Sequence, residues 1–527
     1  MSRAGRVLAG LAVAGACSLG ARAAGAAGFT DYGADLESPP KIFELDGYFR
    51  TRGSLFYNLD LDRGPTPSGE IFFPVPEADP TAQALSLADM RLRADLRLYA
   101  PGGGLALKLR LDALDNVALG SAPEGIPAAA TTQGTTGALL TVRRVYAEAL
   151  TPLGLVTVGR MGHHFGLGML ANGGDCADCD GGDVADRAAL VVPLLGHLWA
   201  LAYDLTSVGP TTRDKTDLRV VALEPTTFVH NLSFAVLGWR GPEARARRTQ
   251  AGKVTPEYGA FVSHRFQKND VPASYLPTAQ PVPIDAAQIM ARGYAATAVD
   301  MWGRVEGPGF RFEAEAAYLH AVVAQPSLIP GVLYRDPVTS NAWGMAFEGE
   351  VGDEAETYRI GLDAGVASGD AAPGFGAFPK AGAAASQPGD LDGPQANPPF
   401  DTTVDNFRFS SDYRIDRILF REILGTVTDA FYFRPRIRGD VYRGRHSKLE
   451  LALAAVTSFA FRPESAPGAE RPLGIEIDPT VRYTNDVGVE AALEQATLLP
   501  LAGLDNPALG LRARPAQLWR LRLTYGF

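Results

Sequence analysis

Charged side chains at every second position are the first residues of this sequence that could do chemistry. Both signs of charge occur, so the rows can pair across neighbouring strands, and they also set the field that a passing ion meets. The excess of arginine favours anions. We therefore expect these side chains to line a pore. They are Arg91, Arg93, Asp95, Arg97, Lys108, Arg110, Asp112, Arg434, Arg436, Arg520 and Arg522.

An acidic stretch with two cysteines, residues 172–186, is the most unusual part of the chain. Cys176 and Cys179 are two residues apart, and in an exported protein such a pair most simply forms a local disulfide. Aspartates flanked by glycines also supply the oxygen ligands that Ca²⁺ prefers, although the closing glutamate of a calcium loop is absent. The sequence leaves both readings open, a disulfide-pinned loop without metal and a calcium site at Asp175, Asp178, Asp180 and Asp183.

His163 and His164 begin the same stretch. Adjacent side chains of an extended chain point to opposite sides, so the two histidines make a poor metal pair. We expect them at the rim of the fold.

A third candidate lies in the long segment 369–425, whose first half is rich in Gly, Ala and Pro. In its second half Ile415, Ile418, Leu419 and Ile423 fall at helical spacing. Two hypotheses follow, a constriction that folds into a barrel mouth and a helical cap on an external loop. In the first, the arginines that face the solute are Arg408, Arg414, Arg417 and Arg421.

Several function classes are disfavoured. The sequence holds no G-x-S-x-G, H-E-x-x-H, Walker or dinucleotide signature, and 7 histidines do not assemble into a site, so we expect no enzyme and no cofactor apart from the calcium alternative. A net charge of −10 argues against nucleic-acid binding, which needs a basic surface.

The elements that position these residues are strands. In 514–527, Trp519, Leu521, Leu523, Tyr525 and Phe527 share one face, while arginines share the other. Such alternation is typical of a strand with lipid on one side and a wet lumen on the other. The terminal aromatics Trp519, Tyr525 and Phe527 resemble the C-terminal signal that the barrel-assembly machinery of Gram-negative bacteria reads.

The spacing of turns predicts how the strands are joined. Short connections such as 100–104 and 306–309 alternate with long loops such as 59–85 and 162–186. No run of 18 apolar residues follows the N-terminal region, which excludes a helical membrane protein. We predict an all-β fold for residues 42–527, a transmembrane antiparallel up-and-down barrel of about 18 strands, with 16 as the alternative. Its long loops are extracellular and its short turns periplasmic.

The N-terminal region predicts export. A basic start, an apolar stretch from Val7 to Leu19 and Ala21-Arg22-Ala23 indicate a signal peptide over residues 1–23. Residues 24–41 follow as a periplasmic lead-in, and the expected location is the outer membrane of a Gram-negative bacterium.

The chain resembles porin-like outer-membrane barrels, and more closely a family of bacterial envelope barrel proteins to which no substrate is assigned. The resemblance rests on Gly159–Phe165, the acidic stretch 175–186, Arg417–Glu422 and Tyr525–Phe527. It implies the barrel and no particular solute.

The leading hypothesis is a channel for passive or selective passage of small hydrophilic solutes through the lipid bilayer. The alternatives are a non-conducting structural or surface-interaction barrel, and a polysaccharide-export barrel. Conductance in planar bilayers separates the first from the second.

Overall fold

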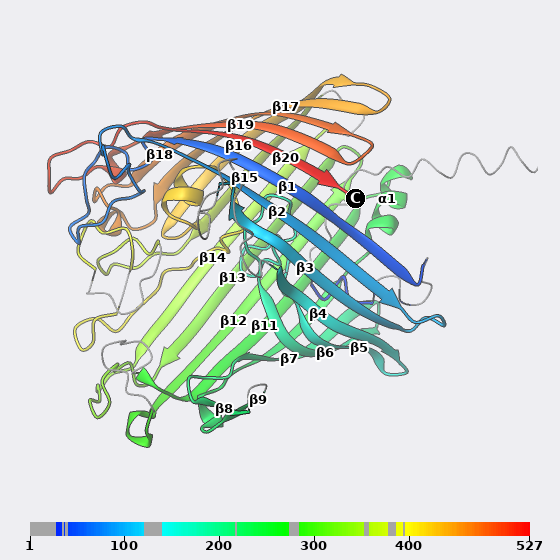
Figure 1. Cartoon of the computed structure of the whole chain (residues 1–527), viewed down its shortest axis with the longest axis horizontal. Helices are drawn as coiled ribbons and strands as arrows, with labels where there is room; N and C mark the ends of the chain where they lie inside the picture. The colour runs from blue at the N-terminus through cyan, green and yellow to red at the C-terminus, as the bar shows by residue number, and fades with distance from the viewer. Residues whose placement is uncertain are drawn as a thin grey trace, which may run out of the picture.

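The chain folds into one closed barrel (Figure 1). The computed structural model describes residues 28–33, 36, 41–120, 140–216, 219–272, 284–352, 358–377, 386–393 and 396–527. Its 18-stranded sheet is antiparallel between neighbours and closes where the first strand pairs with the last, with Tyr48 opposite Gly526. The predicted fold class and strand number are confirmed.

The strands are 9 to 18 residues long and follow one another around the wall in chain order. The barrel strands are β1 (Phe43–Tyr57), β2 (Ala84–Tyr99), β3 (Leu105–Ala118), β4 (Leu140–Thr151), β5 (Gly154–Gly162), β6 (Val184–Leu194), β7 (His197–Ser207), β10 (Val229–Gly238), β11 (Thr255–Asp270), β12 (Met290–Gly307), β13 (Phe310–Val323), β14 (Val338–Val351), β15 (Tyr358–Ala367), β16 (Ala430–Arg443), β17 (Ser447–Ala460), β18 (Pro472–Asn485), β19 (Val489–Pro500) and β20 (Ala516–Gly526). A separate hairpin is formed by β8 (Thr212–Thr216) and β9 (Arg219–Ala222).

The alternation of the sequence decides which face of each strand points outward. On β20 the side chains of Trp519, Leu521 and Tyr525 are exposed, whereas Arg520 and Arg522 between them are buried. A sheet that exposes leucine and aromatic residues over its whole outer surface while burying arginines has the polarity of a membrane-spanning barrel. The barrel is therefore transmembrane.

Connections alternate in length, and the long ones gather at one end. The loops that follow β1 and β15 lie at the left of Figure 1, whereas the C-terminus and α1 (Pro242–Gln250) lie at the right. The hairpin β8–β9 lies in the loop after β7, and α1 occupies the turn after β10. No helix among the described residues is long and apolar enough to cross a membrane.

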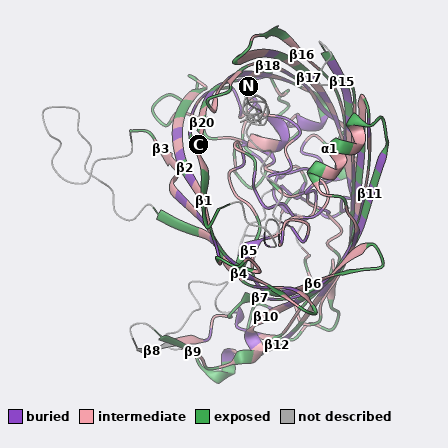
Figure 2. Cartoon of the chain, turned by 90° about the vertical axis from the view of Figure 1, so that its right-hand side faces the viewer, coloured by how far each residue is buried: buried purple, intermediate pink, exposed green. Residues whose placement is uncertain are grey.

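The barrel is not empty. Viewed along the barrel in Figure 2, buried segments cross its interior. They form two apolar clusters, one around Ile418, Phe420 and Tyr432 and the other around Phe29 and Phe261. The second cluster involves Phe29, Tyr32 and Leu36 of the N-terminal region, whereas the predicted signal peptide 1–23 and most of the lead-in lie outside the described residues.

Candidate functional site in the barrel lumen

The wall formed by β20 and β1–β4 carries the predicted charged rows on its inner face. Register places Arg93 opposite Asp112 and Asp95 opposite Arg110. Each arginine holds its carboxylate through two hydrogen bonds, at 2.7 and 2.8 Å for Arg93 and at 2.6 and 2.8 Å for Arg110. Such bidentate pairs fix the geometry of the wall as well as its charge.

The loop between β5 and β6, residues 163–183, lies against this wall and is called the inner loop below. Wall arginines donate to its backbone carbonyl oxygens, with Arg91 2.7 Å from the oxygen of Cys179, Arg93 2.9 Å from that of Gly174, and Arg50 2.9 Å from that of Ala177. Arg50 and Arg91 are completely buried. These arginines are thus occupied by the protein itself rather than open to solutes.

A disulfide joins Cys176 and Cys179 at the tip of the inner loop. The bridge closes a short turn that presents Asp178 and Asp180 towards the centre of the lumen. Of the two sulfur-bearing residues, Cys179 is buried, whereas Cys176 is exposed.

Asp178 and Asp180 form the centre of an ionic network. Arg421 lies 2.6 Å from Asp178, and Arg414 lies 2.6 Å from Asp180. Arg52 of β1 reaches both carboxylates, at 3.1 and 2.8 Å. Although burial opposes the charged form, these guanidinium groups hold the pKa of both aspartates well below the ordinary value, so the network stays ionised.

The same contacts bear on the calcium hypothesis. Asp175 is paired with Arg110 and, at 3.0 Å, with Arg144, while Asp183 accepts a hydrogen bond from the backbone of Asn172 at 2.9 Å. Among the described residues there is no group of three or more His, Cys, Asp or Glu side chains that could hold a metal ion. The arrangement therefore gives the calcium alternative no support.

The two histidines at the start of the inner loop lie inside the lumen rather than at the rim. His163 is packed against Phe261 at 5.4 Å and lies 3.3 Å from Arg187. His164 accepts from the backbone of Gly173 at 3.3 Å and contacts the carbonyl of Gly166 at 3.1 Å. Burial lowers the pKa of both imidazoles, so they act as neutral packing groups.

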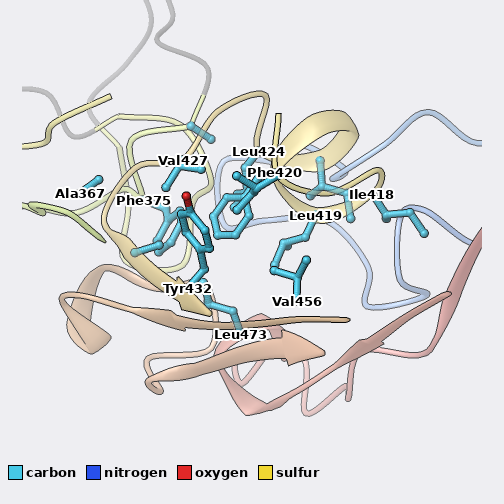
Figure 3. Packing of buried hydrophobic residues seen from close by; sticks show 14 of the residues in the cluster. Ala367, Phe375, Ile418, Leu419, Phe420, Leu424, Val427, Tyr432, Val456 and Leu473 are labelled. Atoms are coloured by element: carbon cyan, nitrogen blue, oxygen red, sulfur yellow. The ribbon is translucent and has the colours of Figure 1, made fainter. Parts of the chain in front are cut away.

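The second crossing segment, residues 405–424, is called the latch segment below. Its predicted helical character appears as a short π-helical turn, Leu419–Ile423. Figure 3 shows Ile418, Leu419 and Phe420 packed towards the barrel wall. Glu476 of β18 accepts the backbone N–H groups of three consecutive residues, Arg417 to Leu419, at 2.8, 2.8 and 3.0 Å. Burial raises the pKa of Asp416, beside this turn, to about 7.

The four arginines predicted to form the constriction lie in the latch segment but are engaged by protein groups. Arg414 and Arg421 bind the inner loop, as described above. Arg408 donates to the carbonyl oxygens of Gly376, at 2.6 Å, and Ala377. Arg417 donates to Thr480 at 2.6 Å. The donors of Arg408, Arg414 and Arg421 are taken up by loop groups distant in sequence, whereas Arg417 binds β18 and also lines the cavity described below, so the constriction stays a prediction.

Two anchors were not singled out in the sequence. Glu315 of β13 accepts the backbone N–H groups of Met169 and Leu170, at 3.2 and 3.1 Å, and so ties the inner loop to the far wall. Glu315 thus holds the inner loop and Glu476 holds the latch segment, so both segments span the lumen. In the sequence Glu315 and Glu476 look like ordinary inward-facing charges, and no local signal marks their partners.

The N-terminal residues 28–33 and 36 fill space next to β4–β7 and β10–β12. Phe29 packs against Phe261 and lies under the guanidinium of Arg187, at 5.2 Å from its carbon. The backbone of Gly33 donates to Glu148 at 3.2 Å. Burial, with Asp175 nearby, raises the pKa of Asp31 to about 7. This part of the predicted lead-in therefore contacts lumen-facing residues.

A cavity of about 230 Å³ remains beside β14–β18. In its wall Arg434 lies 2.8 Å and Arg436 3.1 Å from Asp363. The side chain of Arg434 is 27% exposed, against 5% for Asp363, and Glu348 on the same cavity is 28% exposed. The charged lining residues are Glu348, Asp363, Arg417, Arg434, Arg436, Arg438, Glu450, Asp478 and Arg482.

Several solved outer-membrane proteins are similar to this chain. OccK11 (OpdR) from Pseudomonas aeruginosa matches over 92% of this chain and 96% of its own, with 12% identity and a TM-score of 0.46. OccK9 (OpdG) from the same organism matches over 92% and 98%, with 10% identity and a TM-score of 0.46. A BenF-like porin from Pseudomonas fluorescens Pf-5 matches over 92% and 98%, with 8% identity and a TM-score of 0.43. No family model and no curated protein matches the chain.

Proposed function

We propose that the protein is a narrow channel of the Gram-negative outer membrane that passes small hydrophilic solutes. The observation that carries the proposal is the charged cavity within a closed barrel whose outer face is apolar. A water-filled cavity lined by guanidinium groups gives a permeating solute polar contacts in place of its hydration.

The charge of the cavity supports a preference for anions. Five arginines and four carboxylates line the cavity, so positive charge is in slight excess where a solute would pass. The inner loop and latch segment narrow the lumen, which favours solutes of modest size.

Reconstitution of the purified protein into planar bilayers tests the proposal. We expect discrete ohmic conductance steps, and a reversal potential in a KCl gradient that indicates more chloride than potassium passage. A protein that is inserted, as judged by its protease resistance in vesicles, and yet gives no steps would remove the channel.

A second candidate, a non-conducting barrel, is favoured by one observation. Both crossing segments are tied to opposite walls, through Glu315 and Glu476, and to each other through Asp178 and Asp180. If the two crossing segments never separate, the barrel is closed and its long loops carry the function. The same contacts make passage of a bulky polysaccharide the least favoured of the alternatives.

The proposed location includes assembly by the barrel-assembly machinery. The outward aromatics Trp519, Tyr525 and Phe527 on β20 are exposed and support recognition of this strand. Replacement of Phe527 by Ser should lower the amount of folded protein in the outer membrane without altering the conductance of molecules that do assemble.

A further inference from the structure

The outer face of the barrel carries a polar row that the channel does not use. His264, Thr297, His320 and Asn341 stand directly opposite one another on the adjacent strands β11, β12, β13 and β14. His264 and Thr297 are hydrogen bonded at 2.9 Å, as are His320 and Asn341. We call these four residues the outer polar row.

Neighbouring residues show that the row points outward. Two positions away along each strand and on the same face, Val262, Tyr318 and Trp343 are exposed. Tyr318 also donates to Asn341 at 2.9 Å, and on β7 and β10 Tyr203 and His230 continue the band with a 2.6 Å hydrogen bond. Polar groups in hydrocarbon without partners cost several kcal/mol, so such a band belongs at the edge of the bilayer core.

The height of the row agrees with that placement. His320 lies ten residues after Phe310, the first residue of β13 at the end of the short turns. With a rise of roughly 3.3 Å per residue and a tilt of about 40°, that distance spans about 25 Å along the membrane normal, the height of an apolar belt. The row therefore lies where the hydrocarbon ends, on the side of the long loops.

Strand β16, which is two strands further along the wall from β14, has apolar side chains at the same height. Phe433 lies ten residues before Arg443, the corresponding end of β16, and is exposed. Beyond it Phe431 stacks on Phe459 at 5.0 Å. The band of hydrogen-bonded side chains on β7 and β10–β14 therefore does not continue onto β16, and its partner is expected along those strands.

The chemistry of the row defines the partner. Asn341 Oδ1 can only accept, so Nδ1 of His320 donates to it and Nε2 is left to accept from a hydroxyl or, when protonated, to donate to a phosphate. Among the described residues, no hydrogen-bond partner reaches Nε2 of His230 or His264, whose Nδ1 atoms are the bonded ones. Lys268, exposed four residues beyond His264, adds a cation. Hydroxyls and phosphates occur together in the headgroup of a phosphorylated glycolipid.

We propose that the outer polar row, with Tyr203, His230 and Lys268, binds the phosphorylated sugar headgroup of a glycolipid in the outer leaflet. The proposal rests on the membrane location proposed above and is independent of conduction. The row and its histidines lie on the lipid side of the wall, so their replacement leaves the lumen intact.

Native mass spectrometry in detergent tests the proposal, with lipid A as the probe and phosphatidylethanolamine as the reference lipid. The variant is His230→Phe, His264→Phe and His320→Phe together, which keeps aromatic rings on the outer face but removes their hydrogen bonds. We expect wild type to prefer lipid A, and the variant to lose at least tenfold in lipid A affinity with unchanged binding of the reference lipid.

The matched control is His197→Phe, an outward histidine that contacts Tyr258 near the short turns. It should bind lipid A as wild type does. Lys268→Gln provides a second variant that does not touch the row and should lose affinity by a smaller factor.

Three outcomes overturn the proposal. The first is that both the triple variant and Lys268→Gln bind lipid A as tightly as wild type does. The second is that the His197→Phe control loses as much lipid A affinity as the triple variant. The third is that the triple variant changes its oligomer size while lipid A binding stays intact, which would assign the row to contact with a second copy. Lipid A preference in a protein that gives no conductance would refute the channel and leave this site standing.

Discussion

The two sides of the lumen carry similar arginine rows and use them differently. On β1 and β2, Arg50 and Arg91 are completely buried and donate to backbone carbonyls of the inner loop. On β16, Arg434, Arg436 and Arg438 pair with carboxylates of neighbouring strands, and their side chains stay 27%, 21% and 33% exposed at the cavity. The first set holds a loop in place, and the second set faces the space through which a solute could pass.

The difference teaches that alternation alone does not make an arginine a pore residue. Both rows arise from the same period-two pattern, which buries charge on one face of a strand. What separates them is whether a distant loop covers the row and satisfies its donors. A covered row contributes to rigidity, whereas an uncovered row sets the field in the pore.

The largest effect should come from separating the inner loop from the latch segment on the covered side, which is the wall of β1 and β2. Replacing Asp178 and Asp180 together by Asn removes the carboxylates that link Arg52 of the wall to Arg414 and Arg421 of the latch segment. Removal of one partner of a buried ion pair costs about 3 kcal/mol or more, less for Asp180, whose side chain is 39% exposed. We expect the inner loop and latch segment to separate, with a marked rise in single-channel conductance and a lower unfolding temperature.

The matched control for that variant is Asp186→Asn. Asp186 is paired with Arg160 at 2.7 Å, but both side chains are 49% exposed, and surface pairs contribute roughly 0–1 kcal/mol. Conductance and stability should stay close to wild type. Equal conductance in the double variant and the control would show that the ionic network does not narrow the pore.

The N-terminal residues offer a second way to open the covered side. Deletion of residues 24–40 removes Phe29 and Tyr32 from their contacts with the wall, so conductance should rise, although by less than in the double aspartate variant. Fluorescence of a label placed on the N-terminal segment would report whether the segment leaves the lumen in the intact protein. Unchanged conductance on deletion would mean that the solute path runs only along the cavity side.

The same segment predicts a pH dependence. The pKa of Asp31 is raised to about 7 by burial, so its docked form binds a proton that the free form releases near the ordinary value of 3.8. Docking is therefore favoured at low pH and weakens as pH rises from about 4 to about 7. Conductance should increase across this window, and Asp31→Asn should remove the increase.

Much of the architecture could be predicted from the sequence, and the reason is local. In each strand, residues two apart share a face, as in Trp519 to Phe527, so the alternation predicts which side chains face lipid. The alternation of short and long connections predicts which end of the barrel each connection lies at. The occupied lumen could not be predicted in this way. Arg91 and Arg434 look alike in the sequence. The inner loop that covers Arg91 is held by Glu315 and the latch segment by Glu476, and the partners of these two glutamates lie 57 or more residues away.

The uncovered side should respond in selectivity rather than in conductance. Arg434→Gln with Arg436→Gln removes two accessible charges but keeps side chains that can hydrogen bond to Asp363. The reversal potential in a KCl gradient should shift towards potassium, with little change in single-channel conductance. The comparison on the covered side is Arg91→Gln with Arg93→Gln. This variant should lower the unfolding temperature and leave the reversal potential close to that of wild type. An equal shift from both pairs would erase the distinction between the two rows.

The smallest effect should come from the disulfide. Cys176→Ser with Cys179→Ser opens a bridge whose loop is only four residues long, so the chain-entropy contribution is about 2 kcal/mol. The wall arginines still hold the carbonyl oxygens of the inner loop, so the covered side should remain closed, with conductance near wild type and a slightly lower unfolding temperature. Reductant should reproduce the effect in wild type and do nothing to the variant. If instead either treatment raised conductance as far as the double aspartate variant, the bridge and not the ionic network would be what keeps this side of the lumen covered.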